Sequence, residues 1–82
     1  MKIIKIDNDA IISLENVRRV QRVMEESNHT TYGQRYTVKH YRIRIIYNND
    51  SIECIACGED KQGEKISEEV MEKIFNILLE KD

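Results

Sequence analysis

The sequence contains no proline, only three glycines and only two cysteines. Two cysteines are too few for a disulfide scaffold, and the low content of proline and glycine argues against a disordered linker. No apolar run approaches the ~18 to 20 residues of a membrane span, and the start "MKIIKIDND" turns acidic too early for the core of a signal peptide. We therefore expect a cytoplasmic protein that does not enter a membrane.

Recognisable catalytic motifs are also missing. The sequence has no G-x-G-x-x-G, no P-loop and no nucleophile elbow. Its titratable candidates stand in no spacing that indicates acid–base or nucleophilic catalysis: His29, His40, Cys57, Glu59 and Asp60. His29 lies in the polar stretch "SNHTTYG", which we interpret as a solvated loop. We therefore expect a protein that is not an enzyme and needs no cofactor.

The length of 82 residues predicts one small domain that spans residues 1–82. A chain of this size buries roughly 60% of the surface that its unfolded form exposes, so its core is small. A deep, enclosed site is not expected in so small a fold.

The clearest pattern in the middle of the chain is a hairpin. In "YRIRIIYNNDSIECIACG" apolar residues alternate on both sides of Asn49 and Asp50, as in two half-buried strands. A turn centred on these two residues places Tyr47 opposite Ile52, and Ile45 opposite Cys54. This register predicts that Cys54 is buried.

The same register bears on the C-x-x-C motif. Residues three apart in a strand point to opposite faces, so Cys57 is expected to look away from Cys54. A zinc site needs two more ligands, and a thioredoxin-type site needs the motif at the start of a helix. We therefore predict no metal site and no redox site.

The C-terminal segment "KISEEVMEKIFNILLEKD" predicts a helix. Ser67 is the expected N-cap, Glu68 and Glu69 suit the positive end of the helix dipole, and the helix is expected to run to about Lys81. Its apolar residues cover an arc of roughly 160°, wider than the ~100° that a surface helix needs: Val70, Met71, Ile74, Phe75, Ile77 and Leu78. Such an arc fits either a helix wrapped into a curved sheet or contact with a second subunit.

The N-terminal third contains one clear element and one ambiguous one. "KIIKIDNDAIISL" predicts a hairpin that turns at residues 7–9. Residues 14–26 fit a helix that follows a Ser13 cap, with Leu14, Val17, Val20 and Met24 on one face. They fit a strand equally well, so periodicity leaves both alternatives open.

The segment "AIISLENVRRVQRV" resembles the I-x-L-x-N-V segment of small uncharacterised bacterial and phage-associated proteins. The resemblance rests on "ISLENV" and implies a bend at Glu15 and Asn16, with a new strand that opens at Val17. It also implies a meander of strands followed by one C-terminal helix, similar to a reduced pleckstrin-homology-like sheet. It carries no activity and no catalytic residue. The segment of residues 25–36 is longer and more polar than this pattern leads us to expect.

Charge divides the chain into two halves of opposite sign. Residues 17–44 hold seven Arg or Lys against Glu25 and Glu26, whereas residues 48–82 hold four Lys against ten acids. The basic half is interleaved with tyrosine, a pattern that suits anionic ligands. We select five of its residues as candidate binding residues: Arg22, Tyr36, His40, Arg42 and Arg44. Arg42 and Arg44 are expected on the strand face opposite Tyr41, Ile43 and Ile45, together with His40.

These observations predict an α+β fold, a curved antiparallel sheet of four or five strands with one C-terminal helix packed on one face. They favour a small non-catalytic interaction module that forms homodimers and meets an acidic protein partner through the Arg/Tyr-rich strand face. Binding of single-stranded nucleic acid by the same face is the alternative. Nucleic acid is not favoured, because the sequence pI is only ≈ 5.7. A third interpretation is that Glu53 and other acids of the C-terminal half neutralise Arg42 and Arg44 within the fold.

Overall fold

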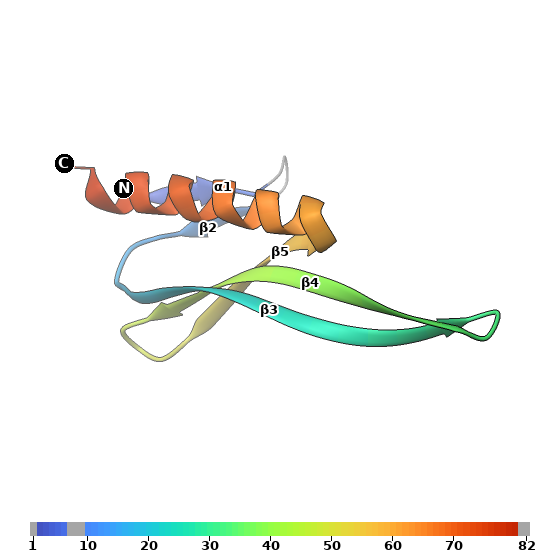
Figure 1. Cartoon of the computed structure of the whole chain (residues 1–82). Coiled ribbons are helices and arrows are strands. Elements are labelled where there is room, and N and C mark those ends of the chain that lie inside the picture. Colours follow the sequence, from blue (N-terminus) through green and yellow to red (C-terminus); the bar gives the residue numbers. More distant parts are fainter. Residues whose placement is uncertain (1, 7–9, 81–82) are drawn as a thin grey trace.

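Two antiparallel sheets and one helix make up the structure, a computed structural model that describes residues 2–6 and 10–80. Within these residues the order is β1 (Ile3–Lys5), β2 (Ile11–Ser13), β3 (Val17–Thr31), β4 (Gln34–Tyr47), β5 (Ile52–Glu59) and α1 (Asp60–Leu79). The small sheet has the order β1-β2 and the larger one the order β3-β4-β5 (Figure 1). The predicted α+β class, with antiparallel strands and a C-terminal helix, is confirmed.

Helix α1 packs against both sheets and closes the core. It contacts β4 and β5 of the larger sheet and β1 of the smaller one. Ile74 of α1 is fully buried with Ile43 and Ile45 of β4, and Ile4 and Leu14 join the same cluster from the N-terminal side. The wide apolar arc of the helix is therefore explained in part by two sheets that share one helix.

The predicted N-terminal hairpin is present. Ile4 of β1 lies directly opposite Ile12 of β2, and the bend that follows contains Asn16 with a positive φ of 60°. The predicted turn at residues 7–9 lies outside the described residues. After the bend, β3 opens at Val17, so residues 17–26 are strand and not helix.

The register of β4 and β5 differs from our prediction by one residue. Ile46 lies opposite Ile52, and Ile43 lies opposite Ile55. The loop between them is one residue longer than expected, because the Tyr47 N–H donates to the Ser51 carbonyl at 2.9 Å and Asp50 adopts a left-handed φ of 69°. This register buries Ile55 beside Ile43, where the predicted register would have placed the smaller Ala56.

The one-residue shift reverses the roles of the two cysteines. Cys57 is buried and Cys54 is exposed, so the prediction of a buried Cys54 was wrong. Cys57 follows Ile55 on the inner face of β5, at the point where a bulge interrupts the pairing with β4. Burial raises the pKa of the Cys57 thiol, and a hydrogen bond with the backbone of Ile43 opposes that rise.

Helix α1 begins at Asp60, well before the predicted N-cap at Ser67. Ser67 lies inside the helix, fully buried, and its hydroxyl donates to the Glu64 carbonyl at 2.7 Å. The early start depends on two glycines. Gly58 has a positive φ of 109°, and Gly63 approaches it so closely that an added Cβ would lie 2.3 Å from the Gly58 carbonyl oxygen.

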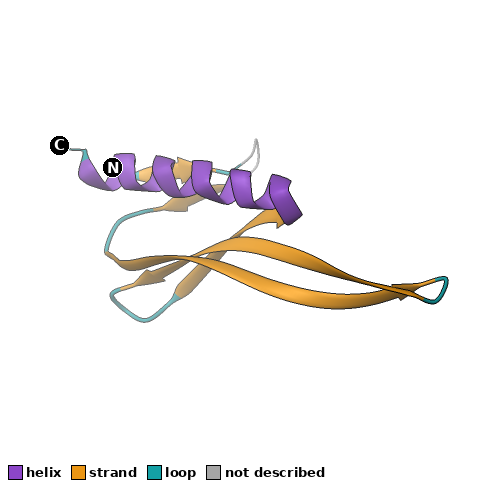
Figure 2. Cartoon of the chain, in the orientation of Figure 1, coloured by secondary structure: helices purple, strands orange, loops and turns teal. Residues whose placement is uncertain are grey.

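Strands β3 and β4 continue past the rest of the molecule as a two-stranded ribbon (Figures 1 and 2). The predicted loop around "SNHTTYG" is wrong, because residues 27–31 belong to β3. The two strands are joined at Tyr32 and Gly33, both with positive φ, and Thr31 pairs with Gln34. Such a two-residue turn matches the twist of the flanking strands and lets the ribbon extend to its end.

The positions of the cysteines predict opposite responses to substitution. Cys57→Ser places a hydroxyl in the core and is expected to lower the free energy of unfolding by about 1 to 3 kcal/mol. Cys54→Ser is expected to change it little, because Cys54 is exposed. Urea unfolding measures both, and thiol labelling of the native protein is expected to modify Cys54 much faster than Cys57. Faster labelling of Cys57 would contradict this register.

The contact between Gly58 and Gly63 predicts an unusual response to alanine. In an ordinary helix Gly→Ala stabilises by roughly 0.5 to 1 kcal/mol. Here Gly63→Ala is expected to destabilise by about 1 to 3 kcal/mol, because its methyl group collides with the Gly58 backbone. Gln62→Ala, at the exposed neighbouring position, is the control and should be close to neutral. A stabilised Gly63→Ala variant would contradict the close approach.

Candidate binding surface

The larger sheet has one face that no described element covers. Residues directly opposite one another on paired strands share a face, so the residues that alternate with Ile43, Ile45 and Ile55 point away from α1. We call this side the outer face (Figure 1). It carries Arg19, Gln21, Val23, Glu25, Ser27, His29 and Thr31 of β3, Gln34, Tyr36, Val38, His40, Arg42, Arg44 and Ile46 of β4, and Ile52, Cys54 and Ala56 of β5.

Arg42 and Arg44 of β4 lie on the outer face, opposite to the side of Ile43 and Ile45, as predicted. Arg42 lies opposite Ala56, and its guanidinium pairs with the Glu25 carboxylate on β3. Its Nε atom is buried and has no hydrogen-bond partner among the described residues. Arg44 lies opposite Cys54, is half-buried, and has no carboxylate partner among those residues. The guanidinium of Arg44 is therefore available to an anion from outside.

The predicted neutralisation by Glu53 is wrong. Glu53 lies opposite Ile45 and therefore points to the inner face, away from Arg42 and Arg44. Other pairs do join the two charged halves of the chain. Arg18 contacts the Asp50 carboxylate at 2.7 Å, and Arg22 contacts that of Glu68 at 3.3 Å.

A polar cluster lies farther along the outer face, where the ribbon leaves the body. The Ser27 hydroxyl lies 2.8 Å from His29 Nε2 and 2.7 Å from His40 Nε2. His29 also stacks on Tyr36, with ring centroids 5.3 Å apart. The Ser27–His29 contact lies within β3, whereas the Ser27–His40 and His29–Tyr36 contacts cross to β4.

The order Ser27, His40, Glu59 invites comparison with a nucleophile, a base and an orienting carboxylate. His40 Nδ1, however, lies 3.8 Å from the Glu59 carboxylate, beyond hydrogen-bond range. His40 and Glu59 are also exposed, and Ser27 is only half-buried. The geometry therefore offers no oriented general base.

The five candidate residues divide into three groups. His40, Arg42 and Arg44 lie together on the outer face, whereas Tyr36 lies on the same face about 27 Å from Arg44 along β4, at ~3.4 Å per residue. Arg22 lies on the inner face, opposite Ile43, with its guanidinium 5.9 Å from the Tyr41 ring centroid. The structure therefore does not bring Arg22 to the same surface as the other four.

Two contributors to this surface were missed in the sequence. Glu25 was counted only as a charge, yet it is the ion-pair partner of Arg42. Ser27 was placed in a loop, yet it joins both histidines. Both contacts could have been predicted from a two-residue turn at Tyr32–Gly33. Such a turn determines which residues of β3 and β4 lie opposite one another, and so places Glu25 and Ser27 near β4.

Within residues 2–6 and 10–80, no three His, Cys, Asp or Glu side chains converge in a way that can hold a metal ion. The described part of the chain has no helix that combines the length and the apolar character needed to cross a membrane.

No known protein family, no curated protein and no solved structure matches this chain. The resemblance of residues 10–23 to small bacterial and phage-associated proteins therefore stays a prediction.

Proposed function

We propose that this protein is a small non-catalytic interaction module, whose outer face binds an acidic partner protein. The observation that carries this proposal is the uncovered arginine pair. Arg42 and Arg44 stand on a sheet face that no described element covers, and Arg44 has no carboxylate partner within the described residues. The planar guanidinium of an unpaired arginine is well suited to bind a carboxylate through two parallel hydrogen bonds.

The neighbours of the two arginines favour a protein as the ligand. Val23, Ile46 and Ile52 lie on the same face, and Ile52 is 55% exposed. Arginine set among apolar side chains is characteristic of the centres of protein interfaces.

One feature supports the alternative, single-stranded nucleic acid. The stacked rings of His29 and Tyr36 present an aromatic surface on the outer face, and bases stack on such surfaces. These rings lie far along the ribbon from Arg44. A single ligand that contacts both the rings and Arg44 must therefore be extended. The two alternatives differ in the salt dependence that they predict.

We further propose that the protein self-associates through one side of α1. Met71, Phe75 and Leu79 follow one another at intervals of four residues, and the side chains of Phe75 and Leu79 are 53% and 76% exposed. Phe75 and Leu79 are exposed and Met71 is partly buried, whereas Ile74 is fully buried and Val70, Ile77 and Leu78 pack against the core. Pairing of the row with its copy on a second chain buries these side chains by two-fold symmetry.

The acidic-partner proposal predicts a selective effect of Arg44→Glu. With a polyglutamate peptide as the probe, fluorescence anisotropy is expected to show binding that Arg44→Glu weakens by about tenfold, or 1.4 kcal/mol. Arg35→Glu makes the same change of charge near the end of the ribbon and is expected to have little effect. An equal loss in both variants would mean that only net charge matters, which contradicts a defined site.

The nucleic-acid alternative is tested with a short oligothymidylate in the same assay. Phosphate contacts lose affinity steeply between roughly 50 mM and 200 mM salt, because each contact releases counterions. We expect weaker binding to the oligonucleotide than to the peptide. Tight, steeply salt-dependent binding of the oligonucleotide that Tyr36→Ala weakens would favour the alternative.

The self-association proposal predicts a dimer that depends on Phe75. Sedimentation at micromolar concentration is expected to show a dimer that added salt does not weaken, because apolar contacts hold it. Phe75→Glu is expected to give a folded monomer, whereas Asn76→Glu, the neighbouring exposed position, is expected to remain a dimer. A wild-type protein that stays monomeric up to about 100 μM would rule the dimer out.

A further inference from the structure

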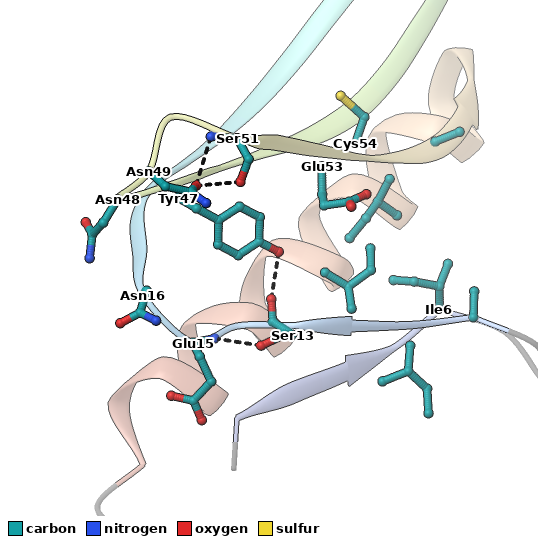
Figure 3. Close-up of a pocket in the computed structure, with 15 residues that line it drawn as sticks. Ile6, Ser13, Glu15, Asn16, Tyr47, Asn48, Asn49, Ser51, Glu53 and Cys54 are labelled. Atoms are coloured by element: carbon teal, nitrogen blue, oxygen red, sulfur yellow. Dashed lines mark hydrogen bonds between the residues drawn. The ribbon is translucent and has the colours of Figure 1, made fainter.

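An open groove of about 1080 Å³ separates the two sheets on the side of β2 and β5 (Figure 3). Its walls are residues 10–13, around β2, and residues 53–56 of β5. Because the sheet orders are β1-β2 and β3-β4-β5, β5 is an edge strand, and β2 has one edge that β1 does not use. The groove therefore lies between two strands that each have an edge with no partner among the described strands.

The backbone of β2 directs hydrogen-bonding groups into the groove. The Ile6 N–H donates to the Ala10 carbonyl, and the Leu14 N–H donates to the Lys2 carbonyl, so even-numbered residues of this segment face β1. Ile11 and Ser13 consequently face the other way. The Ser13 carbonyl accepts a hydrogen bond of 2.7 Å from the Tyr47 hydroxyl, which spans one end of the groove (Figure 3).

The backbone of β5, on the opposite wall, also directs hydrogen-bonding groups into the groove. The Tyr47 N–H donates to the Ser51 carbonyl, so the next hydrogen-bonded pairs along the ladder are Ile45–Glu53 and Ile43–Ile55. The N–H and C=O groups of Cys54 and Ala56 therefore point toward β2. Unpaired groups in this arrangement are a template for one more strand.

The side chains of the groove define which strand fits. Ile12 and Ile55 pack into the core on the α1 side, so a strand between them meets apolar surface on that side. The charged residues that line the groove are both acidic, Glu15 and Glu53. Burial and, to a lesser extent, the Glu53 carboxylate raise the pKa of Tyr47, which favours the protonated hydroxyl that donates to the Ser13 carbonyl.

We propose that the groove accepts an extended segment of a partner protein as an added strand between β2 and β5. On the side that faces α1, this segment carries an apolar residue next to Ile12 and Ile55, and a Lys or Arg two positions away that pairs with Glu53. The added strand joins β1-β2 and β5-β4-β3 into one continuous sheet. This is recognition by strand addition, in which backbone hydrogen bonds supply affinity and alternate side chains supply specificity.

A folded second copy of this chain does not fit the groove. An occupant that bonds to both walls needs two free backbone edges. Each described strand of this protein already uses at least one edge for its neighbour, as β3 and β5 do for β4. The occupant is therefore a single extended segment, which distinguishes this site from the dimer contact proposed for α1.

The test uses a short capped peptide, Thr-Val-Thr-Lys-Thr-Val-Thr, and nuclear magnetic resonance of the full chain. The peptide is expected to shift the amide signals of Ile11, Ser13, Cys54 and Ala56 and to slow their hydrogen exchange. The same peptide with methylated backbone nitrogens is the control and is expected to leave them unchanged. Shifts confined to the free edge of β3, or no shifts with any peptide, would overturn the proposal.

A charge exchange at Glu53 tests the specificity. The Lys peptide is expected to bind about tenfold more tightly than the same peptide with Glu in place of Lys, and Glu53→Lys is expected to reverse this order. Glu69→Lys makes the same change on the exposed side of α1 and should leave the order unchanged. If Glu53→Lys does not alter the preference for the Lys peptide over the Glu peptide, Glu53 does not recognise the charge of the bound segment.

Arg44→Glu separates this site from the outer face. The strand-addition proposal expects Arg44→Glu to leave binding of the Lys peptide unchanged, since Arg44 points away from the inner face. Loss of the Lys peptide in this variant would place its binding outside the groove and overturn the proposal. Binding of polyglutamate to the outer face is measured separately, so either proposal can fail without the other.

Discussion

Ile43 of β4 lies directly opposite Ile55 of β5, and both are buried beneath α1. The face to which each side chain of β4 and β5 points depends on this pair. Because side chains alternate along a strand, the pair sends Arg42, Arg44 and Cys54 to the outer face. It also turns Cys57 into the core and Glu53 toward the groove. A shift of one residue would exchange all of these positions at once.

The same pairing determines where the helix can begin. The bulge near Cys57 is followed by Gly58, whose positive φ turns the chain out of the sheet. Gly63 then rests on the backbone of Gly58, so the first turns of α1 lie against the end of β5. This close approach brings Ile74 over Ile43 and Ile45 and leaves Phe75 and Leu79 on the uncovered side. Two residues without side chains thus position the apolar row that we propose for self-association.

Three kinds of exposed group lie on separate parts of the molecule: arginine side chains, apolar side chains and backbone edges. Arg19, Arg42 and Arg44 lie on the outer face of the sheet, the exposed side chains of Phe75 and Leu79 lie along α1, and edges of β2 and β5 that pair with no described strand line the groove. These surfaces suit different ligands, namely carboxylates, another apolar helix and an extended segment. The separation follows from the arrangement of two sheets around one helix. It adds to the support that the uncovered arginine pair gives to our proposal of an interaction module.

Periodicity and charge in the sequence were sufficient for the α+β class, the N-terminal hairpin, the C-terminal helix and the placement of Arg42 and Arg44 opposite Ile43 and Ile45. These features depend on the local alternation of side chains and on residues a few positions apart, which the sequence displays directly. The register of β4 and β5, the start of α1, the strand at residues 17–31 and the groove were decided only by tertiary structure. The register depends on which side chains the helix buries, and the helix start depends on contact between two glycines. The ribbon depends on strand pairing across a turn, and the groove depends on how two sheets meet on one helix. Each of these features depends on a contact between segments that are separate in the sequence. The energy of such a contact cannot be inferred from a local sequence pattern.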